Sequence, residues 1–432
     1  MQEDSAWIRV SETYNVMALF VLLALLCIRE KFERGDGMSG ALDGVRIIDV
    51  SRVLAGPFCS MILGDLGAEV IKIEHHESGD ETRGWGPPFS GGESAYYLCA
   101  NRNKQSVTLN LKSEQGKEIF QKLISSGDIV VQNFKTGTLE KMGLGYRELK
   151  ECNPKLIMAS ITGFGLTGPY KGLPGYDYII QAMSGLMSIT GEKDGSPVKV
   201  GVAIADILTG LYTCIGILSA LHHRNESGQG QEIDISLMDC QVSSLVNVAS
   251  NYLFNGLTPR RMGNQHPNIV PYQTFPTSDG ELVVAVGNDE QFRRFAAVIG
   301  RPELAEQQRF KHNEKRLLNK EELVPILEES LKTKTKKEWK ELFDAAGIPN
   351  GPIYDIAEMF EDPQISARGM LVEMEHPTID GLRMVGSPLN LSKTPVTMRK
   401  HPPLYGEHTD VILTQLGYDP GQIDKFKQNK II

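Results

Sequence analysis

The stretch VRIIDVSRVLAGPFCSMILGDLGAEVIKIE, residues 45–74, decides the fold of this chain. Its first six residues and its last six (69–74) are rich in β-branched apolar side chains, which predicts two buried strands. Between them, a turn at Gly56 leads into a helix that ends at Gly67, and the proline after Gly56 suits a first helical turn. The stretch therefore predicts a β-α-β unit with two parallel strands.

Strands and helices continue to alternate after this unit. We expect strands at residues 106–111, 128–134 and 156–165, a helix at 113–124, and a strand that runs into a helix in EIDISLMDC, residues 232–240. This alternation predicts an α/β, Rossmann-like lobe whose parallel sheet is covered on both faces. The loops SRVLAGP, QNFKTG and ITGFGLTGPY follow three of the strands, and ligands of such sheets bind at the carboxyl ends of the strands. Taken alone, each loop is also typical of a plain connector.

The middle of the chain changes character twice. GYDYIIQAMSGLMSITG, residues 175–191, predicts one helix. After the extended segment 198–205, Asp206 begins a long helix that is apolar almost all round, which predicts a buried helix. Pro and Gly become frequent after Asn255, and short strands with charged helices follow from Tyr272 to Asp344. This second part predicts a smaller α+β lobe.

The composition excludes several classes of protein. Lys and Arg number 45 against 54 Asp and Glu, so the net charge is −9, whereas general nucleic-acid binding needs a basic face. A hydrophobic fraction of 41% excludes disorder as the dominant state. The six cysteines are scattered, and no metal-binding or P-loop string appears, so no metal site is expected.

The amino terminus carries the apolar run VMALFVLLALLCI, residues 16–28. This run is shorter than the roughly 20 residues that a membrane-spanning helix needs. Glu3, Asp4 and Glu12 precede it, whereas signal peptides begin with basic residues and mitochondrial presequences are poor in acids. Two interpretations stay open: a membrane anchor or atypical targeting segment, or a non-native extension of a protein that starts near Met38.

Two aspartates are candidates for chemistry. Asp206 is either an ordinary helix N-cap or a carboxylate nucleophile able to form a covalent acyl intermediate. Asp177 is expected to cap the helix that follows it. The small residues that would let a thioester approach the backbone near Asp206 are Gly201, Ala203, Ala205 and Gly210. Each of the cations near the predicted strand ends is by itself typical of a solvated surface charge. Together they would form a basic rim for phosphate groups; they are Arg52, Lys72, Arg83, Arg102, Lys104, Lys112, Lys135 and Lys141.

Longer motifs run from Leu42 to the end of the chain. They are LDGVRIIDVSRVLAGPFCSMILGDLGAEVIKIE, GDETRGWGPPF, NRNKQSVTLNLKSEQGK, QNFKTGTLEKMGLGY, SITGFGLTGPY, PGYDYIIQAMSGLMSITG, GVAIADILTGLY, GQGQEIDISLMD, GIPNGPI, MEHPTIDG, VGSPLNLS and PPLYGEHT. This series resembles the family III CoA-transferases (CaiB/BaiF type). The resemblance implies an interlocked homodimer. It also implies a large lobe made of residues 38–255 and 346–432, a linker and small lobe at 256–345, and an extension at 1–37 outside the match.

The resemblance assigns roles to individual residues. It implies that Asp206 attacks the thioester of succinyl-CoA and passes through an aspartyl-acyl anhydride and an aspartyl-CoA thioester. CoA thioesters are then substrates, and no cofactor is bound permanently. The implied CoA contacts are Leu54, Ala55, His75, Leu109, Asn110, Leu111, Lys112, Asn133, Phe134, Lys135 and Lys141. His75 departs from the usual arginine, and histidine holds phosphate less firmly because it is only partly charged near neutral pH.

The same resemblance indicates the substrates, the alternative activities and the cellular location of the protein. The strings RMGNQH and HPNIVPYQTF favour transfer from succinyl-CoA to a dicarboxylate such as glutarate or 3-hydroxy-3-methylglutarate, with Arg83, Tyr272 and Gln273 as candidate carboxylate contacts. The alternatives are another acyl pair, a 2-methylacyl-CoA racemase of the same fold, or an inactive CoA-binding scaffold. Racemases carry a histidine where Tyr176 stands here, and tyrosine is a poor base at neutral pH. A mitochondrial location is implied, with the cytoplasm as the alternative.

Overall fold

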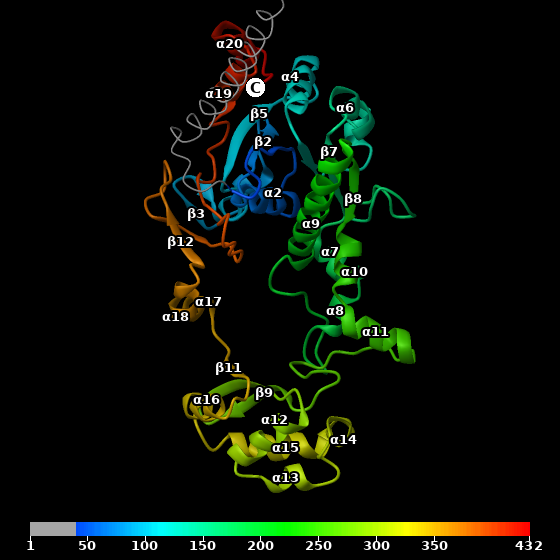
Figure 1. Ribbon diagram of the computed structural model, residues 1–432, viewed down its shortest axis with the longest axis vertical. Coiled ribbons are helices and arrows are strands. Elements are labelled where there is room, and N and C mark those ends of the chain that lie inside the picture. The colour runs from blue at the N-terminus through cyan, green and yellow to red at the C-terminus, as the bar shows by residue number, and fades with distance from the viewer. Residues whose placement is uncertain (1–39) are drawn as a thin grey trace, which may run out of the picture.

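The computed structural model describes residues 40–432, so the apolar run 16–28, Met38 and the extension 1–37 lie outside the described residues. A six-stranded sheet in the order β5-β2-β1-β6-β7-β8 forms the centre of the large lobe (Figure 1). All its neighbouring pairs are parallel. Its strands are β1 (Arg46–Asp49), β2 (Glu69–His75), β5 (Lys104–Leu109), β6 (Ile129–Gln132), β7 (Ile157–Thr162) and β8 (Glu232–Ser236).

The order of the strands gives the sheet a defined ligand-binding edge. Counted along the chain, the strands lie in the order 3-2-1-4-5-6, which is that of dinucleotide-binding Rossmann sheets. The order reverses between β1 and β6, and ligands bind outside the carboxyl ends of the strands at such a reversal. Each strand expected from the sequence is present, and the expected α/β class is confirmed.

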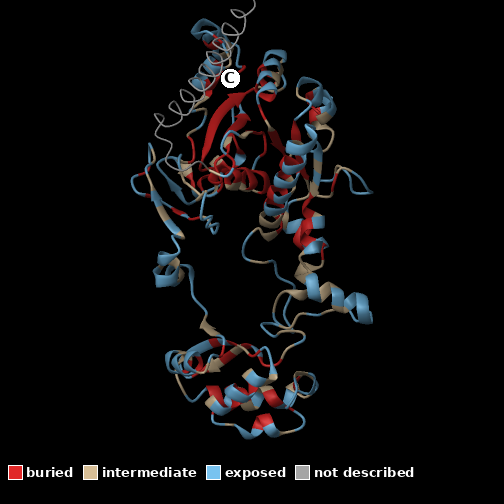
Figure 2. Ribbon diagram, in the orientation of Figure 1, coloured by how far each residue is buried: buried red, intermediate tan, exposed pale blue. Residues whose placement is uncertain are grey.

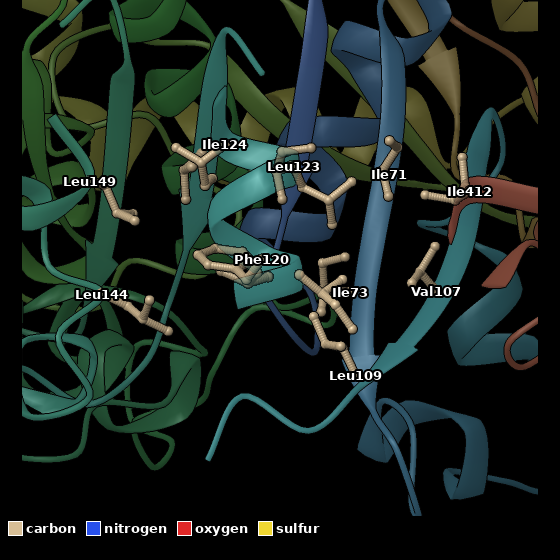
Figure 3. Packing of buried hydrophobic residues seen from close by; sticks show 14 of the residues in the cluster. Ile71, Ile73, Val107, Leu109, Phe120, Leu123, Ile124, Leu144, Leu149 and Ile412 are labelled. Atoms are coloured by element: carbon tan, nitrogen blue, oxygen red, sulfur yellow. The ribbon is translucent and has the colours of Figure 1, made fainter. Parts of the chain in front are cut away.

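Helices cover both faces of the sheet. On one face lie α4 (Glu114–Ser125), α6 (Tyr146–Cys152) and, from the carboxyl end of the chain, α19 (Thr409–Gln415) and α20 (Pro420–Gln428). Figure 3 shows Phe120 and Leu123 of α4 packed with Ile73 of β2 in this core. The other face is covered by α2 (Ala55–Asp65) and α9 (Ile204–Ser227), and Figure 2 shows the sheet between the two faces as buried.

The long helix α9 differs from its prediction in two ways. It begins at Ile204, two residues before Asp206. The expectation that it is buried all round is wrong, because Leu211, Ile215 and Leu218 are exposed along one face. By length and composition α9 would be able to cross a membrane, yet it packs on α2, α10 (Leu237–Ser243) and β7 within the large lobe.

The single helix expected at residues 175–191 is also wrong. The segment forms two short helices, α7 (Asp177–Met183) and α8 (Leu186–Ile189), because Gly185 between them has φ +91°. The remaining elements of the large lobe are η1 (Glu81–Gly84), β3 (Phe89–Ser90), β4 (Glu93–Ser94), α3 (Ala95–Leu98), α5 (Thr138–Lys141) and α11 (Val246–Asn255).

A small lobe lies apart from the large lobe, and two separate segments join them (Figure 1). An antiparallel sheet in the order β11-β10-β9 packs on five helices around an aromatic core that includes Phe295, Trp339 and Phe343. The elements are β9 (Tyr272–Thr277), β10 (Gly280–Ala285), α12 (Asp289–Val298), α13 (Glu303–Glu306), α14 (Asn313–Leu318), α15 (Lys320–Leu331), α16 (Lys336–Ala345) and β11 (Asn350–Pro352). The returning chain forms α17 (Ile356–Glu361), α18 (Pro363–Ala367), β12 (Leu371–Met374) and β13 (Leu382–Val385).

Candidate active site

Two neighbouring cavities lie at the carboxyl ends of the parallel strands. Cavity A, of about 370 Å³, is lined by residues that follow β1, β2 and β5. Cavity B, of about 210 Å³, is lined by the loops that follow β1, β6 and β7, which are the three loops singled out in the sequence. Arg52, Glu81 and Phe134 line both cavities, so A and B share a wall. Both lie at the reversal of strand order.

The loop after β1 is held in a strained conformation by a buried ion pair. Val53 has φ +68°, which is unusual for a β-branched residue. Its N–H donates to both carboxylate oxygens of Asp80, at 3.3 and 3.4 Å. Lys72 Nζ lies 2.9 Å from Asp80 Oδ2, and although burial opposes it, this cation lowers the pKa of Asp80 to about 2. The ion pair thereby fixes the turn that brings residues 54 and 55 to cavity B.

Asn133 joins the loops on the two sides of the strand reversal. Its Oδ1 accepts the N–H of Arg52 at 2.9 Å, and its Nδ2 donates to the carbonyl of Arg52 at 2.8 Å. The guanidinium of Arg52 lies 2.5 Å from Glu81 and 5.8 Å from the centroid of the Phe134 ring. The shared wall of cavities A and B is therefore held by one connected set of contacts.

A glycine brings α9 against α2 and so sets the position of Asp206. A Cβ added at Gly210 would lie 2.8 Å from the carbonyl oxygen of Ala55, closer than such atoms approach. The expectation that Gly210 makes room for a thioester is therefore wrong, because it makes room for α2. Of the other small residues, Gly201 and Ala203 line a third cavity, cavity C, of about 1000 Å³, which adjoins cavity B at Leu54.

Asp206 lines cavity B as the third residue of α9 and is partly buried. Its N-cap alternative is wrong, since Ala203 occupies that position. Within residues 40–432, no side chain or N–H donates a hydrogen bond to its carboxylate. Burial and then the nearby charge of Asp177 raise its pKa to about 7. At neutral pH this carboxylate is ionised in part and unpaired, which suits a nucleophile.

The structure distributes the implied CoA contacts between the two cavities. Cavity A is lined by His75, Leu109, Asn110, Leu111 and Lys112, cavity B by Leu54, Ala55, Asn133 and Lys135, and both by Phe134. Lys141 is exposed at the end of α5 and lines neither cavity. Thr138 of the same helix lines cavity A, so Lys141 lies near that cavity.

The predicted basic rim is wrong for half of its members. Four of the eight cations are mostly or fully buried in ion pairs inside the lobe, because acids from neighbouring elements face them. These pairs are Lys72 with Asp80 (2.9 Å), Arg83 with Glu74 (2.7 Å), Arg102 with Asp65 (2.6 Å) and Lys104 with Asp49 (3.2 Å). Arg52 pairs with Glu81. Of the eight cations, Lys112, Lys135 and Lys141 are the three that are exposed and make no ion pair with another described residue.

Comparison with known proteins shows which family this chain belongs to. The model of CoA-transferase family III matches residues 42–409. The chain is 46% identical to the succinate–glutarate CoA-transferase of Agrobacterium fabrum, over 87% of this chain and 95% of the relative. It is 44% identical to the succinyl-CoA:glutarate CoA-transferase of Homo sapiens, over 88% and 86%. The chain belongs to CoA-transferase family III.

A solved structure agrees with this assignment. A CaiB/BaiF family protein from Brucella suis superposes with a TM-score of 0.78 at 44% identity, covering 88% of this chain and all of that one. As a family III member, the chain is an enzyme that transfers CoA, and CoA thioesters are substrates of such enzymes.

The carboxylate contacts suggested for this CoA-transferase do not gather at the cavities. Arg83 donates to Glu74 and Glu93 in the interior, so its guanidinium is already occupied. Tyr272 and Gln273 belong to β9 in the small lobe and line none of cavities A, B and C. Cavity C instead offers Arg383 as an exposed cation, which the sequence did not single out.

The sequence also missed a contact across 28 residues. Asp177 is the first residue of α7 rather than its N-cap, which is Tyr176, so the expected capping role is wrong. Its Oδ1 instead accepts the N–H of Ala205 at 2.8 Å, in the first turn of α9. The sequence carries a signal only for the other partner of Asp177: Gln181 lies four residues further along the helix, where side chains are neighbours, and its Nε2 donates to Asp177 Oδ2 at 2.7 Å.

Proposed function

We propose that this enzyme transfers CoA from succinyl-CoA to a dicarboxylate such as glutarate, with Asp206 as the nucleophile. The observation that carries the proposal is the unpaired Asp206 carboxylate, with a pKa near 7, in a cavity that shares a wall with a second cavity over the strand reversal. The names of the relatives from Agrobacterium fabrum and Homo sapiens support this choice of donor and acceptor.

The first half of the reaction moves CoA onto the enzyme. An oxygen of Asp206 attacks the thioester carbonyl carbon of succinyl-CoA, the C–S bond breaks, and CoA leaves as a thiolate from a mixed anhydride. The thiolate then attacks the Asp206 carbonyl carbon. Succinate leaves and an aspartyl-CoA thioester remains, so the energy of the thioester is kept rather than lost to water.

The second half reverses these steps with a new acid. A carboxylate of glutarate attacks the carbonyl of the aspartyl-CoA thioester and releases the thiolate. The thiolate attacks the glutaryl carbonyl, which forms glutaryl-CoA and regenerates the Asp206 carboxylate. Backbone N–H groups at the start of α2, where residues 54 and 55 line cavity B, are suited to stabilise the oxyanions.

The two cavities together suggest a path for CoA. We propose that its nucleotide end occupies cavity A and that its pantetheine arm passes Arg52 and Phe134 to reach Asp206 in cavity B. The exposed lysines Lys112, Lys135 and Lys141 would contribute charge-assisted contacts to phosphate groups. His75, at the exposed end of β2, would add a weaker contact.

Mass spectrometry tests the nucleophile directly. The protein is incubated with succinyl-CoA and hydroxylamine, with and without glutarate, and the peptide that carries Asp206 is analysed. We expect a hydroxamate on Asp206 that diminishes when glutarate turns over. Asp206→Asn should remove the label and lower transfer by at least about 10³-fold, whereas Asp194→Asn, which changes the same charge on an exposed residue, should leave both unchanged.

Other outcomes identify the alternatives. Exchange of the proton next to the thioester carbonyl, without a label on Asp206, would indicate a racemase. Glutaryl-CoA formation without a label would contradict the covalent route. Binding of succinyl-CoA without exchange, label or transfer would indicate a scaffold.

We also propose that the enzyme is an interlocked homodimer. Apolar side chains stand exposed on α9 and α11, including Phe254 at 94% and Leu253 at 79% exposure, and such patches are typical of protein interfaces. The separate connections between the lobes would allow a second chain to pass between them. Sedimentation analysis should give twice the chain mass of 47.8 kDa, and a stable monomer would contradict the proposal.

A further inference from the structure

The first turn of α9 is capped by a residue from outside the helix. Ala203, its N-cap, makes no side-chain capping hydrogen bond. Asp177 Oδ1 accepts the N–H of Ala205 at 2.8 Å and that of Asp206 at 3.4 Å. The N–H groups that would ordinarily stabilise an anion at this helix start are therefore directed at Asp177 rather than at Asp206.

A buried glutamine holds Asp177 in this position. Gln181 is fully buried, and its Nε2 donates to Asp177 Oδ2 at 2.7 Å. Its Oε1 accepts the N–H of Val200 at 2.9 Å, and Nε2 also lies 3.4 Å from the carbonyl of Val202. Gln181 thus connects Asp177 to the segment that leads into α9, so both carboxylate oxygens of Asp177 have fixed partners.

We infer that Asp177, held by Gln181, is a positioning residue that fixes the first turn of α9 and keeps the Asp206 carboxylate basic enough to attack a thioester. The inference rests on the proposed function, because it assigns Asp177 a part in the reaction of Asp206. Asp177 itself does not line cavity A, B or C, so its effect passes through Asp206 and the helix.

The electrostatics agree with this geometry. A carboxylate in the first turn of a helix is ordinarily stabilised as an anion, which would lower its pKa and its basicity. Here burial and then Asp177 act in the opposite direction and raise the pKa of Asp206 to about 7. A more basic carboxylate is a stronger nucleophile. The charge of Asp177 therefore destabilises the ionised form of Asp206 and makes it more reactive.

The other charged and titratable groups around Asp206 do not replace Asp177. In cavity B, Arg52 and Glu81 neutralise each other, and the exposed Lys135 lies after β6. Tyr96 of α3 lines cavity C; burial and then the charge of Asp206 raise its pKa to about 12, so it stays neutral. Tyr176, which also lines cavity B, is exposed.

The test compares three substitutions at one position. Asp177→Asn and Asp177→Ser remove the charge and keep an oxygen that accepts N–H groups, so at least one neutral variant should fold. Asp177→Glu keeps the charge. The measurement is the rate of hydroxamate formation at Asp206 with succinyl-CoA between about pH 5 and pH 9, with melting temperature as the check on folding and Asp194→Asn as the charge control.

The expected result separates charge from structure. The rate of hydroxamate formation should fall on the acid side of its pH profile as Asp206 becomes protonated, and the midpoint of this acid limb should lie near pH 7 in the unaltered enzyme. It should move down by roughly one pH unit in the neutral variants, with a loss of about three-fold at pH 8. Asp177→Glu should keep the limb near 7 and lose rate only through geometry. A merely structural role would lower the rate and the melting temperature of all three variants without moving the limb.

Two failures are distinguishable. If the unaltered enzyme forms no hydroxamate at Asp206, the proposed function fails. If it does, but the neutral variants fold and keep the acid limb of the unaltered enzyme, the role assigned to Asp177 is overturned while the proposed function stands.

Discussion

Asp49 and Asp206 are two carboxylates withdrawn from water in the same lobe, with opposite surroundings. Asp49 ends β1, is fully buried and accepts hydrogen bonds from two serines and from Lys104 at 3.2 Å. Burial alone would raise its pKa, but the charges of Lys104 and Lys72 and the serine hydroxyls hold it below the ordinary value. Asp206 has no such partner, and burial with Asp177 raises its pKa to about 7.

The difference shows that the supply of partners, rather than burial, decides what a carboxylate does. At position 49 the negative charge is part of the packing, because the buried ammonium of Lys104 faces it. At position 206 the charge is unmatched in the folded state, which lowers stability and raises reactivity together. Removing each charge should therefore have effects of opposite sign on the free energy of unfolding.

The largest effect is expected from Asp49→Asn. It leaves the buried Lys104 without its anion, and removing one partner of a buried ion pair costs about 3 to 5 kcal/mol. Lys104 keeps only neutral acceptors, the carbonyl of Pro57 and the side chain of Asn101, both at 2.9 Å. Urea denaturation followed by circular dichroism measures the loss.

An exposed ion pair provides the matched control for this variant. Asp410 lies 2.6 Å from Lys427, and both side chains are about half exposed. Asp410→Asn should cost less than about 1 kcal/mol, because surface ion pairs contribute little. A similar small loss from Asp49→Asn would remove the distinction drawn between the two carboxylates.

The second effect has the opposite sign, since Asp206→Asn should stabilise the fold. A folded-state pKa of about 7, above the ordinary 3.8, makes ionisation unfavourable in the folded protein. This cost is absent below about pH 4, grows as the pH rises and is complete above about pH 7. A three-unit shift sets an upper limit near 4 kcal/mol, and partial exposure reduces it to about 2 kcal/mol.

Denaturation at two pH values checks this prediction. The advantage of the Asn variant should be present at about pH 8 and nearly absent at about pH 4. A gain in stability that is the same at both pH values would point to packing rather than charge. If the Asn variant and the unaltered protein were equally stable at both pH values, Asp206 would be adequately solvated.

The sequence predicts the sheet well because its signals are local. Continuous apolar runs define β1, β2, β6 and β7, and their alternation with helices gives the parallel order. β5 is the partial exception: it begins at Lys104, two residues before the expected start, because Lys104 and Gln105 look like surface residues. Both are buried, and Lys104 only by virtue of Asp49, which is 55 residues away.

The candidate site is predictable only in outline for the same reason. The sequence places the loops after β1, β6 and β7 at the carboxyl ends of parallel strands, where ligands bind in such sheets. The capping of α9 by Asp177 and the burial of Arg83 among acids depend on contacts between segments far apart in the chain. No local sequence pattern encodes such pairs. The roles predicted for Asp177 and Arg83 are therefore wrong, although the predicted strands and loops around them are present.

Among the variants of the two compared carboxylates, the smallest effect is expected from Ser60→Ala, which removes one donor from Asp49. The Ser60 hydroxyl lies 2.5 Å from Asp49 Oδ2 in the interior, and losing one hydrogen bond to a charged group costs about 1 to 2 kcal/mol. A lowered folded-state pKa stabilises above the ordinary value of 3.8 and less as the pH falls through the folded value. The loss should therefore be full at neutral pH and shrink in acid, while labelling of Asp206 stays unchanged. If Ser60→Ala cost nothing at neutral pH, the remaining partners Lys104, Lys72 and Ser51 would suffice to hold Asp49, and the contrast with Asp206 would not depend on this hydroxyl.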